Sequence, residues 1–173
     1  MNTTPEVNLY VQNAGLVLAQ GFFPVLFQHL GLINNQQFAD EQARLTAVRC
    51  LQFVATGLSH TDELLLPLNK VLCGLPLTTP VPKGIPITDK QTTLVETLIK
   101  AIIGQWQKIG NCTIEGFRIS WLQREGVLVE QEERWELTVE IRAYDLLLQQ
   151  LPFSFSVIKY PWMDKPLHVT WAY

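Results

Sequence analysis

The sequence predicts an α+β fold in which a helical N-terminal two-thirds packs on a small antiparallel sheet in the C-terminal third. Apolar residues between 94 and 109 recur at steps of three and four residues, which is typical of an amphipathic helix. Segments 135–141 and 167–171 instead alternate apolar and polar residues, as half-buried strands do. The composition is that of a globular chain, because 47% of the 173 residues are hydrophobic and only 17% are charged.

The N-terminal elements follow from the same patterns. Residues 7–11 alternate apolar side chains with larger or polar ones, which indicates a short strand. Residues 22–30 place apolar side chains on one stripe and predict a helix. Pro24 fits the first turn of that helix, where an amide N–H is not needed, and Gly31 is suited to its end.

A stronger helix is predicted over residues 38–56. Asp40 and Glu41 are favourable in its first turn because of the helix dipole. Gly57 follows at the position where a residue with positive φ commonly ends a helix. The leucine-rich segment that comes next contains Pro67, which is expected to begin a second turn rather than to interrupt one helix.

Residues 78–86 are rich in proline and predict a stiff, extended linker. The length of the chain suits a single domain over residues 1–173. Within that domain, residues 76–87 are the candidate joint between a helical subdomain (1–110) and a sheet-containing subdomain (111–173).

The helix after this linker has the clearest boundaries. Thr88 can cap its first turn, and Gln91 three residues later completes a capping box. The apolar stripe continues to Ile109, and Gly110 is expected to end the helix. Residues 114–125 then predict one more helix.

Four strands are predicted in the C-terminal third. Residues 127–129 and 135–141 are expected to pair as an antiparallel hairpin. Residues 153–157 alternate Phe and Val with Ser and predict a third strand, and residues 167–171 predict a fourth.

Charge and apolar content exclude several classes of function. The formal net charge is −3, so the basic excess that drives phosphate binding is missing and nucleic acid is not an expected partner. No run approaches the roughly 20 apolar residues that cross a bilayer, and the N-terminus lacks the basic region of a signal peptide. The protein is therefore expected in the cytoplasm, without membrane insertion.

The cysteines are expected to behave as small buried hydrophobic residues. Cys50, Cys73 and Cys112 are odd in number and far apart in sequence. A disulfide framework needs an even set, and a zinc site needs closely spaced ligands, so the sequence favours neither.

Catalytic motifs are missing from the sequence. It holds no glycine-rich phosphate loop, no G-x-S-x-G elbow and no H-E-x-x-H helix. The histidines, His29, His60 and His168, are far apart, and His168 lies on an alternating strand where a packed or solvent-facing side chain is the favoured interpretation. No catalytic residue, cofactor, metal or small-molecule substrate is expected.

One cluster permits two interpretations. His60, Asp62 and Glu63 lie within four residues, just before an apolar run, and could serve as a general acid and base. The favoured alternative is a helix start, in which Thr61 or Asp62 caps the first turn and the acidic charges favour the positive end of the helix. A small hydrolase or transferase would need a pocket that joins this cluster to one of the other histidines.

Several motifs, spread over nearly the whole chain, resemble those of one family in the same order. They are YVQNAGLVL at 10–18, NKVLCGLP at 69–76, EGFR at 115–118, WLQREG at 121–126, IKYPWM at 158–163 and LHVTW at 167–171. In these segments the chain resembles the contractile injection system tape measure protein family.

The resemblance implies a non-enzymatic structural component of a phage-tail-like particle with a contractile sheath around an inner tube. Such a tape-measure-type protein takes part in tube length control or in tube and baseplate assembly. The implied partners are other particle proteins of the inner tube, the baseplate or the cap, and the implied location is the cytoplasm, within the assembled particle. The family offers no catalytic residues to carry over.

The length of the chain limits how it could act as a ruler. One unbroken helix would span roughly 260 Å at about 1.5 Å per residue. The sequence instead predicts proline-rich breaks and a sheet, and a compact fold of this size is only about 35–40 Å across. The chain is therefore expected to be the globular family domain, which could anchor or initiate a tube, serve a short particle or act as an accessory copy.

The C-terminal aromatic segment is the candidate docking surface. It consists of Tyr160, Pro161, Trp162 and Met163, together with Trp171. Proline stiffens the loop, and Trp and Met are frequent interface residues. The alternative is that Trp162 fills the core of its own domain. A free-standing cytosolic adaptor is the alternative to a particle component.

Overall fold

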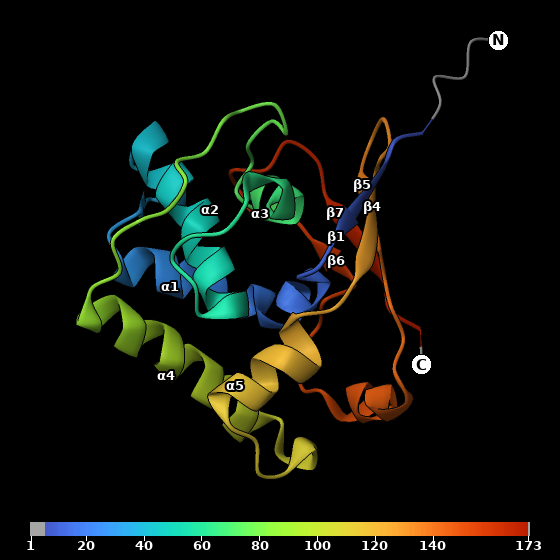
Figure 1. The fold of residues 1–173 in the computed structure, drawn as a ribbon. Helices are drawn as coiled ribbons and strands as arrows, with labels where there is room; N and C mark the ends of the chain where they lie inside the picture. The colour runs from blue at the N-terminus through green and yellow to red at the C-terminus, as the bar shows by residue number, and fades with distance from the viewer. Residues whose placement is uncertain (1–5, 173) are drawn as a thin grey trace, which may run out of the picture.

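The computed structural model describes residues 6–172. A five-stranded sheet stands at one side of the molecule, and the α-helices gather on the other (Figure 1). In spatial order the strands are β1 (Asn8–Val11), β4 (Gly126–Glu130), β5 (Trp135–Val139), β7 (Leu167–Thr170) and β6 (Val157–Ile158).

The helices lie mostly in the N-terminal part of the chain. They are α1 (Phe23–His29), α2 (Glu41–Thr56), α3 (Pro67–Leu72), α4 (Asp89–Gln105) and α5 (Ile114–Phe117), and α5 continues into the π-helical turn η4 (Arg118–Leu122). Residues 6–172 also contain four 3₁₀ segments: η1 (Ala14–Phe22), η2 (Glu63–Leu65), η3 (Gln107–Ile109) and η5 (Ala143–Gln150).

This arrangement confirms the predicted α+β class. Most of the sheet comes from the C-terminal third, and its pairs are antiparallel except for β5 with β7, which run parallel. The predicted N-terminal strand is present and lies at one edge of this sheet, where β1 pairs with β4. The sheet therefore joins the two ends of the sequence.

Helix α2 begins later than predicted, at Glu41 instead of residue 38. The reason is a small hairpin of β2 (Ile33–Asn34) and β3 (Gln37–Phe38), whose two turn residues both have positive φ. Asp40 caps the helix by accepting a hydrogen bond from the Ala43 N–H at 2.7 Å, and Gly57 ends it with φ of 74°. The predicted stop at Gly57 and the first-turn position of Glu41 are confirmed, whereas Asp40, which was expected inside the first turn, is the N-cap.

The predicted capping box of α4 is confirmed. The Thr88 hydroxyl accepts from the Gln91 N–H at 3.2 Å, and the Gln91 side chain accepts from the Thr88 N–H at 2.9 Å. The α-helix ends at Gln105, and η3 carries the chain on to Gly110. Pro67 begins α3, also as predicted.

Two C-terminal predictions need correction. The helix expected over 114–125 stops at Leu122. The strand expected over 153–157 is reduced to the two residues of β6. Residues 153–156 are irregular, although the Ser156 carbonyl oxygen still accepts from the Val169 N–H of β7 at 2.9 Å. Phe153 packs edge-on against Phe22 instead, with ring centroids 5.4 Å apart.

The strand expected over 135–141 is also shorter. Strand β5 ends at Val139, and the Ile141 side chain is 57% exposed. Its antiparallel partner is β4, in the predicted hairpin. Buried side chains from Val11 to Trp171 belong to a core cluster between the sheet and the helices.

Candidate interaction surface

The predicted docking segment supplies core side chains. Trp162 is 6% exposed, and its indole N–H donates to the Leu72 carbonyl oxygen at 2.8 Å. Its ring lies 4.8 Å from the Tyr160 ring and 4.9 Å from the Phe38 ring, between centroids. This geometry supports the interpretation that Trp162 fills the core of its own domain.

The neighbours of Trp162 are held in the same way. The Tyr160 hydroxyl donates to the Gln20 carbonyl oxygen at 2.5 Å, and the Met163 sulfur accepts from the Tyr160 N–H at 3.4 Å. Both side chains are buried, whereas Pro161 is exposed. Docking through this segment stays a prediction, and Pro161 is the exposed residue of 160–163 that it could use.

Trp171 belongs to a buried polar cluster elsewhere in the core. Its indole N–H donates to the Asp145 carboxylate at 2.9 Å, and Arg124 binds both oxygens of that carboxylate at 2.6 and 2.8 Å. Burial by itself raises the pKa of Asp145. These hydrogen bonds, together with one from the Arg142 N–H, lower the pKa by more than burial raises it, so the net pKa lies below its ordinary value. The cluster fixes structure and faces no solvent.

The cluster of His60, Asp62 and Glu63 is used structurally. Asp62 caps η2 by accepting from the Leu64 N–H at 2.9 Å, which confirms the capping interpretation. Glu63 accepts from the Lys70 ammonium at 3.1 Å and from the Val81 N–H at 2.9 Å. These bonds lower the Glu63 pKa. Both carboxylates are therefore occupied in holding the chain.

His60 lies at the proline-rich loop. Its ring is 2.8 Å from the Ser59 hydroxyl, and its backbone forms an isolated bridge with Gly84. Within residues 6–172, neither His29 on α1 nor His168 on β7 lines the hollow beside this cluster. The pocket that a hydrolase would require is not formed by these side chains.

In the described part of the chain, His, Cys, Asp and Glu side chains do not gather in a group of three or more that could hold a metal ion. Among the same residues, no helix combines the length and the apolar character needed to cross a bilayer.

The cysteines take the expected positions, with one difference. Cys50 and Cys73 are buried, and burial raises the pKa of Cys50 to about 12. Cys112 is only partly buried. All three are free thiols.

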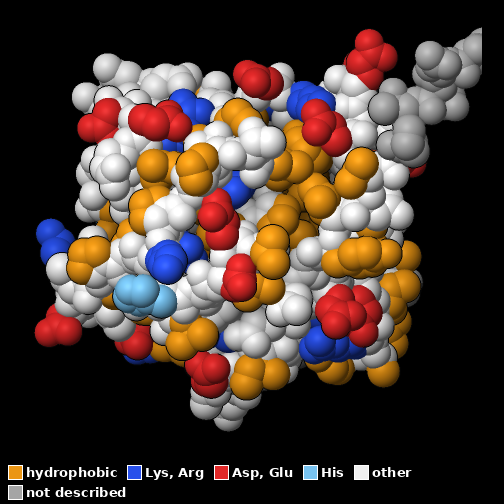
Figure 2. Space-filling view, turned by 45° about the horizontal axis from the view of Figure 1, so that its top comes forward, with side chains coloured by type: hydrophobic (Ala, Val, Ile, Leu, Met, Phe, Trp, Pro, Cys, Tyr) orange, Lys and Arg blue, Asp and Glu red, His pale blue; other side chains and the backbone are white. Residues whose placement is uncertain are grey.

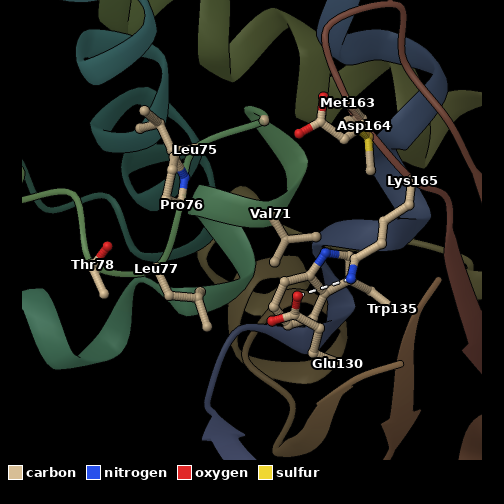
Figure 3. A pocket seen from close by; sticks show the side chains of 11 residues that line it. Val71, Leu75, Pro76, Leu77, Thr78, Glu130, Trp135, Met163, Asp164 and Lys165 are labelled. Atoms are coloured by element: carbon tan, nitrogen blue, oxygen red, sulfur yellow. Dashed lines mark hydrogen bonds and ion pairs between the residues drawn. The ribbon is translucent and has the colours of Figure 1, made fainter. Parts of the chain in front are cut away.

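A first hollow, of about 460 Å³, lies between the end of α3 and the β4–β5 hairpin, and Figure 3 shows its lining. Val71, Leu77, Trp135 and Met163 give it an apolar wall. Lys165 extends over the Trp135 ring at 5.3 Å and reaches Glu130 at 2.8 Å. Met163, a residue of the predicted docking segment, thus borders this hollow.

A second hollow, of about 590 Å³, shares Leu77 and Thr78 with the first and continues to β1. Its other lining residues are Leu9, Tyr10, Asp62, Glu63, Leu64, Pro67, Lys70 and Pro80. Figure 2 shows hydrophobic side chains gathered along a hollowed band on this face, with acidic side chains at its margins. Sequence patterns did not identify Leu64 or Trp135 as part of this surface. The alternation in residues 7–11 did indicate that Tyr10 and Leu9 point to opposite faces of a strand.

The fold and these surfaces define a class of protein: a packed α+β protein whose described polar clusters hold the chain together and whose two hollows beside α3 have apolar walls. The comparison with known families is more specific. The family model of the contractile injection system tape measure protein matches residues 1–171, and the chain belongs to this family. The resemblance inferred from the sequence is thereby confirmed. No curated protein and no solved structure matches the chain significantly.

Proposed function

We propose that this chain is a non-enzymatic structural component of a contractile injection system particle, acting in tube length control or in assembly of the tube and baseplate. The observation that carries the proposal is the family match, which extends over residues 1–171. The use of Asp62, Glu63 and Asp145 as structural groups agrees with a role that needs no reaction.

The shape of the described residues favours action by contact over action as an extended ruler. Their longest helix, α4, has 17 residues, which corresponds to about 25 Å at 1.5 Å per residue. A part played by these residues in length control would therefore operate at an end of the tube, where a packed domain can bind a neighbour. Anchoring or initiating the tube fits this geometry best.

The proposed partners are particle proteins of the inner tube, the baseplate or the cap, met in the cytoplasm where the particle assembles. A net charge of −3 gives no support to nucleic-acid binding. A small-molecule substrate is not part of the proposal.

The experiment is deletion of the coding sequence in the producing cell, followed by electron microscopy of purified particles and mass spectrometry of their proteins. We expect the chain in wild-type particles. Altered tube length after deletion would support length control, and missing or detached tubes would support assembly. Particles that lack the chain and are unchanged by its deletion would contradict the proposal and favour a free-standing adaptor.

A further inference from the structure

The hollow beside β1 lies at an open edge of the sheet. Strand β1 ends the strand order and pairs on one side only, with β4. Leu9 and Tyr10 are consecutive and therefore point to opposite faces of the sheet, yet both line the same hollow. A hollow lined from both faces lies along the edge of the strand, where every second residue of β1 directs its N–H and C=O away from β4.

This edge carries the most exposed large hydrophobic side chains of residues 6–172. Leu64 is 81% exposed, Tyr10 is 76% exposed and Val7 is 67% exposed. Leu64 and Tyr10 line the hollow, and Val7 directly precedes β1. Exposed apolar side chains that cluster in this way are typical of interaction sites, whereas isolated ones are not informative.

The charged side chains that line the hollow differ in whether they have an ion-pair partner. Lys70 is buried and binds Glu63 at 3.1 Å and the Leu77 carbonyl oxygen at 3.0 Å, so its charge is already neutralised. Asp62 is exposed, and its carboxylate accepts only the capping N–H of Leu64 among the hydrogen bonds of the described residues. Asp62 forms no direct ion pair among the described residues, although Arg49 is close enough to feel its charge. The hollow therefore offers one exposed carboxylate without a bonded cation beside an apolar wall, which complements a cation on an apolar segment.

We propose that an extended segment of another particle protein binds along the open edge of β1. Its backbone pairs with the outward N–H and C=O groups of Asn8–Val11, as in other cases of strand addition. Its apolar side chains cover Leu64 and Tyr10, and a Lys or Arg lies beside Asp62. This inference rests on the proposed function for the source of the segment, and it adds the chemistry and the place of the contact.

The test uses the full chain and overlapping synthetic peptides that cover the inner-tube, baseplate and cap proteins of the same particle. Binding is measured by fluorescence polarisation. We expect at least one peptide with alternating apolar residues and a Lys or Arg to bind, and to slow hydrogen exchange of outward amides in Asn8–Val11.

Matched variants locate the contact. Leu64→Asp should weaken binding about tenfold or more, because it places a charge in the apolar wall. Leu146→Asp is the control, since Leu146 is 63% exposed on η5 and lies outside the hollow. Asp62→Asn keeps a capping oxygen and removes the charge, so it should weaken binding and reduce its dependence on salt.

The outcomes separate this inference from the proposed function. If no peptide binds, or if Leu64→Asp binds as the wild type does, the inference is overturned, while incorporation into particles still decides the proposed function. A concentration-dependent dimer that Leu64→Asp abolishes would replace the partner segment with a second copy of this chain. Equal melting temperatures of wild type, Leu64→Asp and Leu146→Asp would exclude unfolding as the cause.

Discussion

Arg124 and Asp145 form an ion pair whose side chains are both 0% exposed. Three aromatic rings surround the guanidinium, those of Trp121, Tyr144 and Trp171, each with its centroid 5.2 Å away. Removing one partner of such a pair costs more than the pair contributes, because the other charge stays buried without compensation. The position of the sheet relative to η5 therefore depends on both residues together.

Asp145→Asn should lower the free energy of unfolding by about 3–5 kcal/mol, because it leaves the Arg124 charge uncompensated while keeping the size of the side chain. Urea unfolding followed by circular dichroism measures the change. Asp164→Asn is the control, because Asp164 is exposed and should shift stability by less than about 0.5 kcal/mol. Equal effects of the two variants would contradict the importance of the pair.

The same pair predicts a dependence on pH. The pKa of Asp145 is lower in the folded protein than the value of about 3.9 expected in the unfolded chain. Its contribution to stability is therefore fully present above that value and is lost as the pH falls toward the folded pKa. The unfolding free energy of wild type should fall more steeply than that of Asp145→Asn below about pH 4.

Trp162→Ala separates the two interpretations of the C-terminal aromatic segment. The indole is buried and bonded to Leu72, so we expect a loss of about 3–5 kcal/mol and a clearly lower melting temperature. Pro161→Ala is the matched surface variant from the same loop. Unchanged melting of Trp162→Ala together with loss from particles would instead support docking through the indole.

Capping side chains set where the helices of this protein begin. The capping box makes Thr88 the start of α4, and the cost of losing an N-cap is about 1 kcal/mol. Thr88→Ala should therefore destabilise the protein by that amount in thermal or urea unfolding. Thr93→Ala is the control in the same helix, because the exposed Thr93 hydroxyl only donates to the Asp89 carbonyl oxygen. A larger effect at Thr93 would be inconsistent with this account.

The 3₁₀ segment η1 contains two glycines in different surroundings. A Cβ on Gly15 would collide with the carbonyl group of Trp121, whereas a Cβ on Gly21 would meet no atom within 4 Å. Gly15→Ala should therefore cost about 3 kcal/mol or more, since backbone must move. Gly21→Ala should change stability by less than about 1 kcal/mol. Comparable melting temperatures of the two variants would disprove the close approach of η1 to η4.

At the scale of the whole molecule, the core cluster includes buried side chains on both sides of residues 76–87. We therefore expect one cooperative unfolding transition, with tryptophan fluorescence and far-ultraviolet circular dichroism changing together. Two separated transitions would indicate that the predicted joint divides the chain into subdomains. The single-domain organisation stays a prediction until this measurement.

Local signals in the sequence predicted most helices and strands. The features that the sequence could not predict depend on contacts between residues far apart in the chain. Asp40, Thr88 and Pro67 act on neighbours within a few residues, so their positions could be predicted. The parallel pairing of β5 with β7 depends on segments more than 25 residues apart, for which no alternation gives the partner.

Long-range contacts also explain why the sequence could not predict the candidate interaction surface. The segment 158–163 was singled out for its residue types, but only tertiary contacts decide that Trp162 turns inward. The hollow beside β1 joins residues from β1, η2 and the loop after α3, which are brought together by the fold. Sequence patterns could place Tyr10 on one face of a strand, but not beside Leu64.

The edge position of β1 has a consequence for synthesis on the ribosome. Asn8 pairs with Val129, so the first strand emerges more than a hundred residues before its partner does. At bacterial and eukaryotic translation rates of about 5–20 residues per second, this delay is on the order of ten seconds. Throughout that interval both edges of the nascent β1 segment lack a partner, whereas in the folded protein only one edge does.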